Sequence, residues 1–122
     1  MKDSAILLMK AFDKAASVLE LSISEKSKML GIHPRTFIRN LEKGYLPGSK
    51  IGERQLYFIQ LYKALYQISS GDIAFMQHWY NTDNKALNGS PRILCRSIND
   101  MLRVTQYLQS LHPKSSYVVP HI

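Results

Sequence analysis

The sequence predicts an all-α protein, and three observations support this fold class. Apolar residues recur at the three-to-four-residue spacing of helices in every long segment. Residues that favour helix starts and stops separate these segments, and no segment alternates apolar and polar residues strongly enough to build a sheet. With 122 residues, 45% of them apolar and 20% charged, the chain fits one domain or two small lobes that share a core.

The first two helices are expected within residues 4–30. Residues 4–20 place apolar side chains at helical spacing with charges between them. Ser22 and Glu25 have the spacing of a capping box, in which each side chain satisfies a backbone N–H of the first turn. Gly31 follows, and glycine most easily adopts the positive φ that ends a helix. Ser24 is an alternative cap, and the sequence predicts a short helix from about Ser24 to Leu30 that ends at Gly31.

A third and a fourth helix are expected on either side of a turn-rich connection. Pro34 suits the first turn of a helix, where its missing N–H costs nothing, and Gly44 is expected to end that helix. Residues 53–69 are apolar on almost every side. They predict a long central helix.

The C-terminal half is expected to contain three shorter helices. Asp72 can cap the first of them, and Ser90 followed by Pro91 has the cap-then-proline form that opens the second. Asn99 is expected to cap the last helix, and Pro113 prevents its continuation.

Composition limits the classes of function. No apolar run approaches the roughly 18 residues of a membrane span, and the N-terminus mixes acid and base too closely for a signal peptide. Cys95 is the only cysteine, so no internal disulfide is possible and a reducing cytoplasm is the expected compartment. We expect a cytoplasmic protein without a membrane partner.

Charge favours an anionic partner. The net charge is +7, with 16 basic and nine acidic residues. Seven of the basic residues and only three of the acidic ones lie between Ser24 and Arg54. Nucleic acid is the most common partner of such a segment.

The helix that begins at Pro34 separates two faces. On a helical wheel of about 100° per residue, Phe37 and Ile38 lie on the side that packs, opposite Arg39. Together with the helix that ends at Gly31, it predicts a helix-turn-helix. The residues expected to bind DNA are Lys26, Lys28, His33, Arg35, Thr36, Arg39, Asn40 and Lys43.

Each of these residue types has a role in a major groove. Arginine can pair with guanine, asparagine with adenine, and the threonine methyl can meet a thymine methyl, whereas the lysines are expected to contact phosphates. His33 is expected to be a cap or turn residue that can also touch a phosphate. The alternative is a basic helix face that is only solvated.

The central helix has more apolar surface than a small chain can easily bury, so we expect part of it to form a homodimer interface. Tyrosine is common at interfaces because its ring is apolar and its hydroxyl can stay wet. The alternative is an ordinary core helix. The expected interface residues are Tyr57, Leu61, Tyr62 and Tyr66.

No catalytic or metal-binding pattern is present in the sequence. The four histidines are far apart, Cys95 has no neighbour with ligand spacing, and no glycine-rich phosphate loop occurs. We expect no enzyme activity, no cofactor, no bound metal and no small-molecule substrate.

Three segments resemble a known family. "LGIHPRTFIRNLEKG", "GERQLYFIQLYKALYQI" and "FMQHWYNTDNKALNGSPRILC" are similar to the recognition segment, the central helix and the toxin-binding motif of the Xre/MbcA/ParS-like antitoxins. Asp83 stands where the family has proline. The residues that carry the resemblance are Gly31, Trp79, Asn84, Leu87, Gly89 and Pro91.

The resemblance implies an antitoxin of a type II toxin–antitoxin system. Its helix-turn-helix lobe, residues 1–50, would bind operator DNA, and a long central helix would join it to a toxin-binding lobe, residues 51–122. Such antitoxins neutralise RES-type or ADP-ribosyltransferase-like toxins that use NAD, and they repress their own operon as dimers. In this chain, the toxin-binding residues implied are Arg92, Lys114, Ser115, Ser116, Tyr117 and Val118.

Physical reasoning gives plainer roles to the motif residues. Asn84 and Gly89 have the character of turn residues between two helices, and Trp79 is expected to be a core anchor beneath the loop. Two alternatives remain open for the whole chain. One is a stand-alone helix-turn-helix regulator, and the other is a toxin-binding module whose basic lobe does not read DNA.

Overall fold

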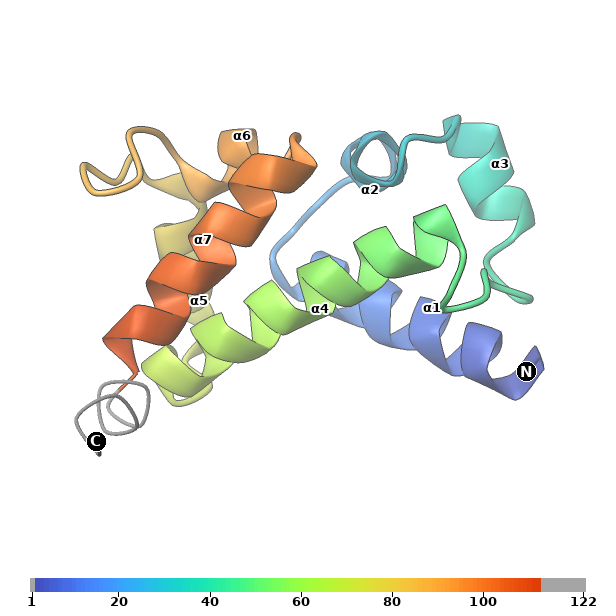
Figure 1. Ribbon diagram of the computed structural model, residues 1–122, viewed down its shortest axis with the longest axis horizontal. Coiled ribbons are helices and arrows are strands. Elements are labelled where there is room, and N and C mark those ends of the chain that lie inside the picture. The colour runs from blue at the N-terminus through green and yellow to red at the C-terminus, as the bar shows by residue number, and fades with distance from the viewer. Residues whose placement is uncertain (1, 113–122) are drawn as a thin grey trace. The chain divides into compact units, whose positions relative to one another are not determined.

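The structure is a computed structural model that describes residues 2–112, and this part of the chain is all α-helical, as predicted (Figure 1). None of its helices is long and apolar enough to cross a membrane. The helices are α1 (Lys2–Val18), α2 (Ile23–Leu30), α3 (Pro34–Arg39), α4 (Lys50–Ser69), α5 (Ile73–Asn81), α6 (Pro91–Leu94) and α7 (Ile98–Leu111).

The chain divides into two compact units, unit 1 (Met1–Ile59) and unit 2 (Gln60–Ile122). The division falls inside α4, later than the predicted boundary after residue 50. Unit 1 therefore contains α1, α2, α3 and the first half of α4, and unit 2 contains the second half of α4, α5, α6 and α7.

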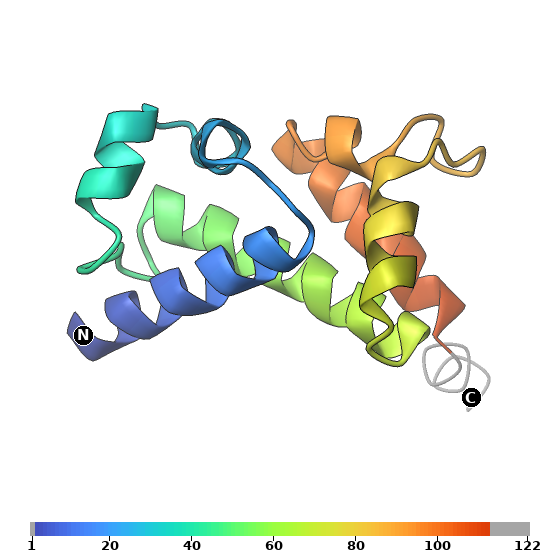
Figure 2. The same ribbon diagram turned by 180° about the vertical axis from the view of Figure 1, so that it is seen from behind.

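The core of unit 1 is organised around three phenylalanines. Phe12 of α1 meets Phe37 of α3 and Phe58 of α4 edge to face, with ring centroids 6.3 and 5.6 Å apart. All three side chains are completely buried. Such pairs contribute about 0.5–1.5 kcal/mol each beyond the burial of their area. The cluster thus joins α1 to both α3 and α4, and the second half of α1 runs across α4 in Figures 1 and 2.

The predicted capping box and stop of α2 are confirmed, and Ser22, not Ser24, is the cap. The Ser22 hydroxyl accepts from the Glu25 N–H at 3.1 Å, and the Glu25 carboxylate accepts from the Ser22 N–H at 2.9 Å. Gly31 ends the helix with φ of 76°. The capping box and the glycine therefore determine both ends of α2 through local chemistry.

The end of α3 was predicted wrongly. The helix begins at Pro34 as expected but ends at Arg39, and turns continue the chain to Gly44. At Gly44, φ is 68°, and a Cβ there would collide with the Ala5 carbonyl oxygen of α1. Gly44 is needed because the chain passes directly over the backbone of α1.

The central helix α4 has a buried side and an exposed side. Its buried residues recur every three positions, with Gln55, Phe58 and Leu61 fully enclosed. On the other side, Leu56 and Tyr66 are exposed. The prediction that Leu61 belongs to a dimer interface is wrong, because that side chain is already buried within its own chain.

Unit 2 surrounds a core to which α5 contributes Met76 and Tyr80. The expectation that Trp79 would be the core anchor is wrong. Trp79 is half-buried, whereas its neighbour Tyr80 is completely buried. The last helix is capped by Ser97, whose hydroxyl accepts from the Asp100 N–H, and not by Asn99 as predicted.

Candidate functional site

The candidate site is the tight connection between α2 and α3. Three residues, 31 to 33, join the two helices, which contact each other and are consecutive in Figure 1. Ser27, small and fully buried, lies on the inner side of α2. The α2–turn–α3 unit has the element order and short turn of a helix-turn-helix.

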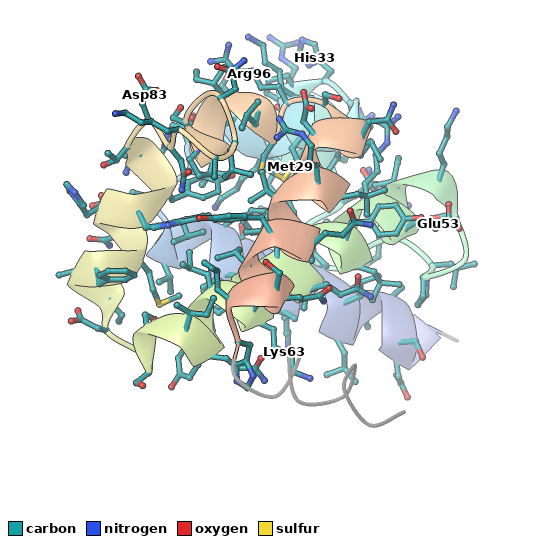
Figure 3. The ribbon with its side chains drawn as sticks, turned by 60° about the vertical axis from the view of Figure 1, so that its left-hand side comes forward. Met29, His33, Glu53, Lys63, Asp83 and Arg96 are labelled. Atoms are coloured by element: carbon teal, nitrogen blue, oxygen red, sulfur yellow. The ribbon has the colours of Figure 1, made fainter. Side chains whose placement is uncertain are left out.

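His33 caps α3 as expected. Its Nδ1 accepts a hydrogen bond from the Arg35 N–H at 3.1 Å. A neutral ring that accepts at Nδ1 carries its proton on Nε2, so Nε2 can donate outward. The residue is exposed, and it is labelled in Figure 3. It can therefore cap the helix and donate to an anion at the same time.

The outer face of α3 carries two arginines and one isoleucine. Arg35 and Arg39 are exposed, and Thr36 is half-buried. Ile38, predicted to pack, is 51% exposed, so that expectation is wrong. The predicted wheel contained the signal, since it places Ile38 only about 60° from Arg35.

Asn40 does not have the role predicted for it. Its Nδ2 donates to the Thr36 carbonyl oxygen at 2.9 Å and to the Tyr45 hydroxyl at 3.1 Å. A bidentate pair with adenine needs that same amide N–H₂ as donor. Asn40 therefore holds the end of α3 onto the following loop and does not offer a free amide to a base.

Lys26 was predicted to contact phosphate, and this is wrong. Its side chain is 9% exposed, and its Nζ donates to Asp13 Oδ1 at 2.8 Å and to Ser17 Oγ at 2.9 Å. This ion pair, in which Lys26 is buried and Asp13 is half-exposed, joins α2 to α1. Lys28, two residues later on the opposite side of α2, is exposed and remains a phosphate candidate, as does the exposed Lys43.

Arg54, a residue of α4, lies beside the turn without having been predicted as a site residue. A Cβ added at Gly31 would meet the Arg54 guanidinium directly. The cation thus lies at the C-terminal end of α2, where a positive charge is favourable. No local sequence signal places it there, because the contact joins residues that are far apart along the chain.

Four exposed cations lie on or close in sequence to α2 and α3, namely Lys28, Arg35, Arg39 and Lys43. Arginine and lysine side chains of this kind can donate to anionic groups such as phosphates. Among residues 2–112, no group of three or more His, Cys, Asp or Glu side chains could hold a metal ion.

The motif loop of unit 2, residues 82–90, is closed by its own hydrogen bonds. The Asn84 N–H donates to the Gly89 carbonyl at 3.0 Å, and Asn84 Oδ1 accepts from the Ala86 N–H at 2.9 Å. Leu87 is buried beneath the loop. Asn84 thus forms the turn expected of it. Figure 3 labels Asp83, which is exposed at the start of this turn.

The segment after the loop is also held internally. Ser90 caps α6 through the Ile93 N–H, and Pro91 is buried as its first residue. The Arg92 Nε donates to Asn81 Oδ1, and the guanidinium lies 5.7 Å from the centre of the Tyr80 ring. Arg92 therefore packs against α5, although it is only half-buried.

Cys95 ends α6 in the core of unit 2. Burial raises the pKa of its thiol to about 12, the Tyr80 hydroxyl opposes this rise by hydrogen bonding, and Asp100 adds to it. A thiol with such a pKa stays protonated and unreactive at neutral pH. It is a core residue and not a nucleophile.

The predicted dimer-interface residues are partly exposed, whereas most of the predicted toxin-binding residues are not described by the structure. Tyr57 and Tyr62 are half-buried and Tyr66 is half-exposed, so each can contribute to an interface. Burial and the neighbouring Tyr66 raise the pKa of Tyr62, and the two rings lie 6.3 Å apart. Five residues for which the resemblance implies toxin binding lie outside the described residues: Lys114, Ser115, Ser116, Tyr117 and Val118.

Comparison with known proteins adds no relative. No protein-family model matches the sequence, and no curated protein matches it.

Proposed function

We propose that this protein is a DNA-binding antitoxin that represses its own operon. The DNA-binding part of this proposal rests on one observation. The α2–turn–α3 unit is anchored by buried Phe37, and it presents Arg35 and Arg39 on its outer face.

The supporting framework suits this role. Phe37 fixes α3 in the aromatic cluster, the Lys26–Asp13 ion pair fixes α2 on α1, and Asn40 holds the end of α3. A recognition helix must be held in one orientation, because base contacts depend on the angle at which it enters the groove. Every one of these contacts lies within unit 1.

The toxin-binding half rests on the motif resemblance and on the loop of unit 2. Trp79, half-buried next to a closed loop, offers part of a large ring to a partner, and tryptophan is enriched where binding energy is concentrated. We expect the toxin to be an NAD-using enzyme, with the segment after residue 112 contributing to its inhibition. The half-exposed tyrosines of α4 are proposed as part of a homodimer interface that presents two recognition helices to two half-sites.

The DNA-binding half is tested by selecting an operator from random and upstream DNA and measuring its affinity. Arg39→Ala should weaken binding by about 1–3 kcal/mol, because it removes a base contact. Arg103→Ala is the matched control. It removes the same charge from unit 2, where Arg103 forms an exposed pair with Asp100, and it should bind like the wild type.

Salt dependence supplies the second readout. Binding through several phosphates should fall about 10³-fold or more between 50 and 200 mM salt. Equal affinity of Arg39→Ala and wild type for the operator would contradict the proposed role of α3. Weak, sequence-independent binding would favour a toxin-binding module whose basic lobe does not read DNA.

The toxin half is tested by expressing the adjacent open reading frame with and without this protein and then purifying any complex. Relief of toxicity with a stable complex supports the antitoxin. Deletion of residues 113–122 should then impair neutralisation and leave operator binding intact. Absence of toxicity and of any complex would favour the stand-alone regulator.

A further inference from the structure

Ile38 is an exposed apolar side chain on a face that is otherwise cationic. It is 51% exposed and lies three residues after Arg35 and one residue before Arg39. A single exposed isoleucine is ordinary on a protein surface. Its place is not ordinary here, because the same short helix buries Phe37 and turns this side outward.

Fewer of the predicted residues are free to contact bases than the sequence suggested. The amide of Asn40 is held by Thr36 and Tyr45, so it does not supply the pairing with adenine. The buried Lys26 side chain donates to Asp13 and is not available to a base. The side chains left on the outer face of α3 are two arginines, one half-buried threonine and Ile38.

We propose that Ile38 reads the C5-methyl group of a thymine in the major groove. The proposal rests on the DNA-binding function proposed above and adds the chemistry of one contacted base. Thymine alone among the four bases presents a methyl group in that groove, and apolar side chains recognise it by contact. A branched side chain that is half-exposed in the free protein can bury that methyl without rearranging the core.

The positions of the arginines on α3 indicate how far that thymine lies from a contacted guanine. Arg35 and Arg39 are suited to guanine O6 and N7. Ile38 lies about 4.5 Å along the helix axis from Arg35, which is close to the roughly 3.4 Å spacing of successive bases on one strand. The contacted thymine should therefore lie within one or two base pairs of a contacted guanine in each half-site.

The experiment replaces each thymine of the selected operator with deoxyuridine, one at a time. This change removes only the methyl group. Wild-type protein should bind one such operator about three- to tenfold more weakly, as expected for the loss of one buried methyl contact. Ile38→Ala should bind the thymine and uracil forms equally, and Ile38→Val should show an intermediate difference.

Leu46→Ala is the control. Leu46 is 52% exposed in the same unit, but it lies in the loop before α4 and not on α3. Its variant should keep the full difference between the thymine and uracil operators. Circular dichroism melting checks that all variants fold.

The outcomes separate this inference from the proposed function. A wild-type protein that binds a selected operator, with strong salt dependence, but responds to no deoxyuridine would overturn the inference alone. So would an Ile38→Ala variant that keeps the full uracil penalty, or one whose only defect is a smaller mass in light scattering, which would place Ile38 in contact between copies. Absence of any selected DNA would overturn both.

Discussion

Two helices of this protein begin in the same way but use their first arginine differently. His33-Pro34 opens α3 in unit 1, and Ser90-Pro91 opens α6 in unit 2, each with a capping side chain and then proline at the first helical position. An arginine comes next in both. Arg35 is exposed, whereas Arg92 donates to Asn81 and lies over the Tyr80 ring.

The difference shows that the same local pattern can leave an arginine exposed or pack it against a neighbouring helix. The cap and the proline set the start of each helix in both cases. Whether the arginine side chain packs or stays exposed depends on the neighbouring helix. In unit 2, α5 places an amide and an aromatic ring beside Arg92, and in unit 1 the corresponding side of α3 is open.

The largest expected effect comes from breaking the support of α3. Gly44→Ala should destabilise the protein by roughly 2–4 kcal/mol, because the residue has a left-handed φ and its Cβ would strike the Ala5 carbonyl. Gly48→Ala is the control, since nothing lies within 4 Å of its Cβ. Chemical denaturation measures both, and equal stability of the two variants would contradict the close approach.

A smaller effect is expected from the two lysines of α2. Lys26→Met should cost about 2 kcal/mol of stability, because it removes charge-assisted hydrogen bonds to Asp13 and Ser17. Its effect on the salt slope of DNA binding should be close to zero. Lys28→Met should do the reverse, preserving stability and reducing the slope by about 1. A reduced slope for Lys26→Met would mean that its ammonium reaches phosphate.

Substitutions of Arg35 and Arg92 test the comparison between α3 and α6 directly. Arg92→Ala should lower stability by about 1 kcal/mol, since it removes a hydrogen bond and a cation–π contact. Arg35→Ala should leave stability unchanged and weaken operator binding. Thermal melting gives the stability of both variants, and operator titration gives their affinity for DNA. An Arg92→Ala variant as stable as the wild type would show that the contact with α5 contributes nothing.

The smallest effect concerns the thiol in unit 2. The folded-state pKa of Cys95, about 12, lies above its unfolded value, so its contribution is fully present below about pH 8.5 and is lost as pH rises toward the folded value. Stability should fall by up to about 1 kcal/mol between pH 9 and 10 through this group. Comparing the wild type with Cys95→Ala over that interval isolates it, and identical slopes would argue against a buried thiol.

Local chemistry was predictable from the sequence, and contacts between distant residues were not. The capping box of Ser22, the stop at Gly31 and the two cap-then-proline starts depend on residues within a few positions of one another. The burial of Lys26 depends on Asp13, which is 13 residues away on another helix. A wheel drawn on α2 alone cannot contain that information.

Two further errors have specific causes. Trp79 and Tyr80 are adjacent and lie about 100° apart around α5. The sequence alone does not show which of the two faces the core, because the packing of the whole unit decides it. The helix that begins at Pro34 was expected to end at Gly44, but it ends at Arg39, where the Asn40 amide donates to the Thr36 carbonyl. Beyond that residue, the positions on a helical wheel no longer apply.

In the proposed DNA-binding function, the shortness of α3 limits the information that one copy can extract from DNA. The helix has six residues, one of which is buried as an anchor, so its remaining side chains can contact about three base pairs. Two copies would then specify about six base pairs, a sequence that occurs by chance roughly once in 4,000 positions. That frequency is far too high for a genome that offers about 10⁶ or more competing sites. The remaining selectivity must come from half-site spacing, DNA deformability or repeated operators. A short recognition helix thus makes the arrangement of sites as informative as their sequence.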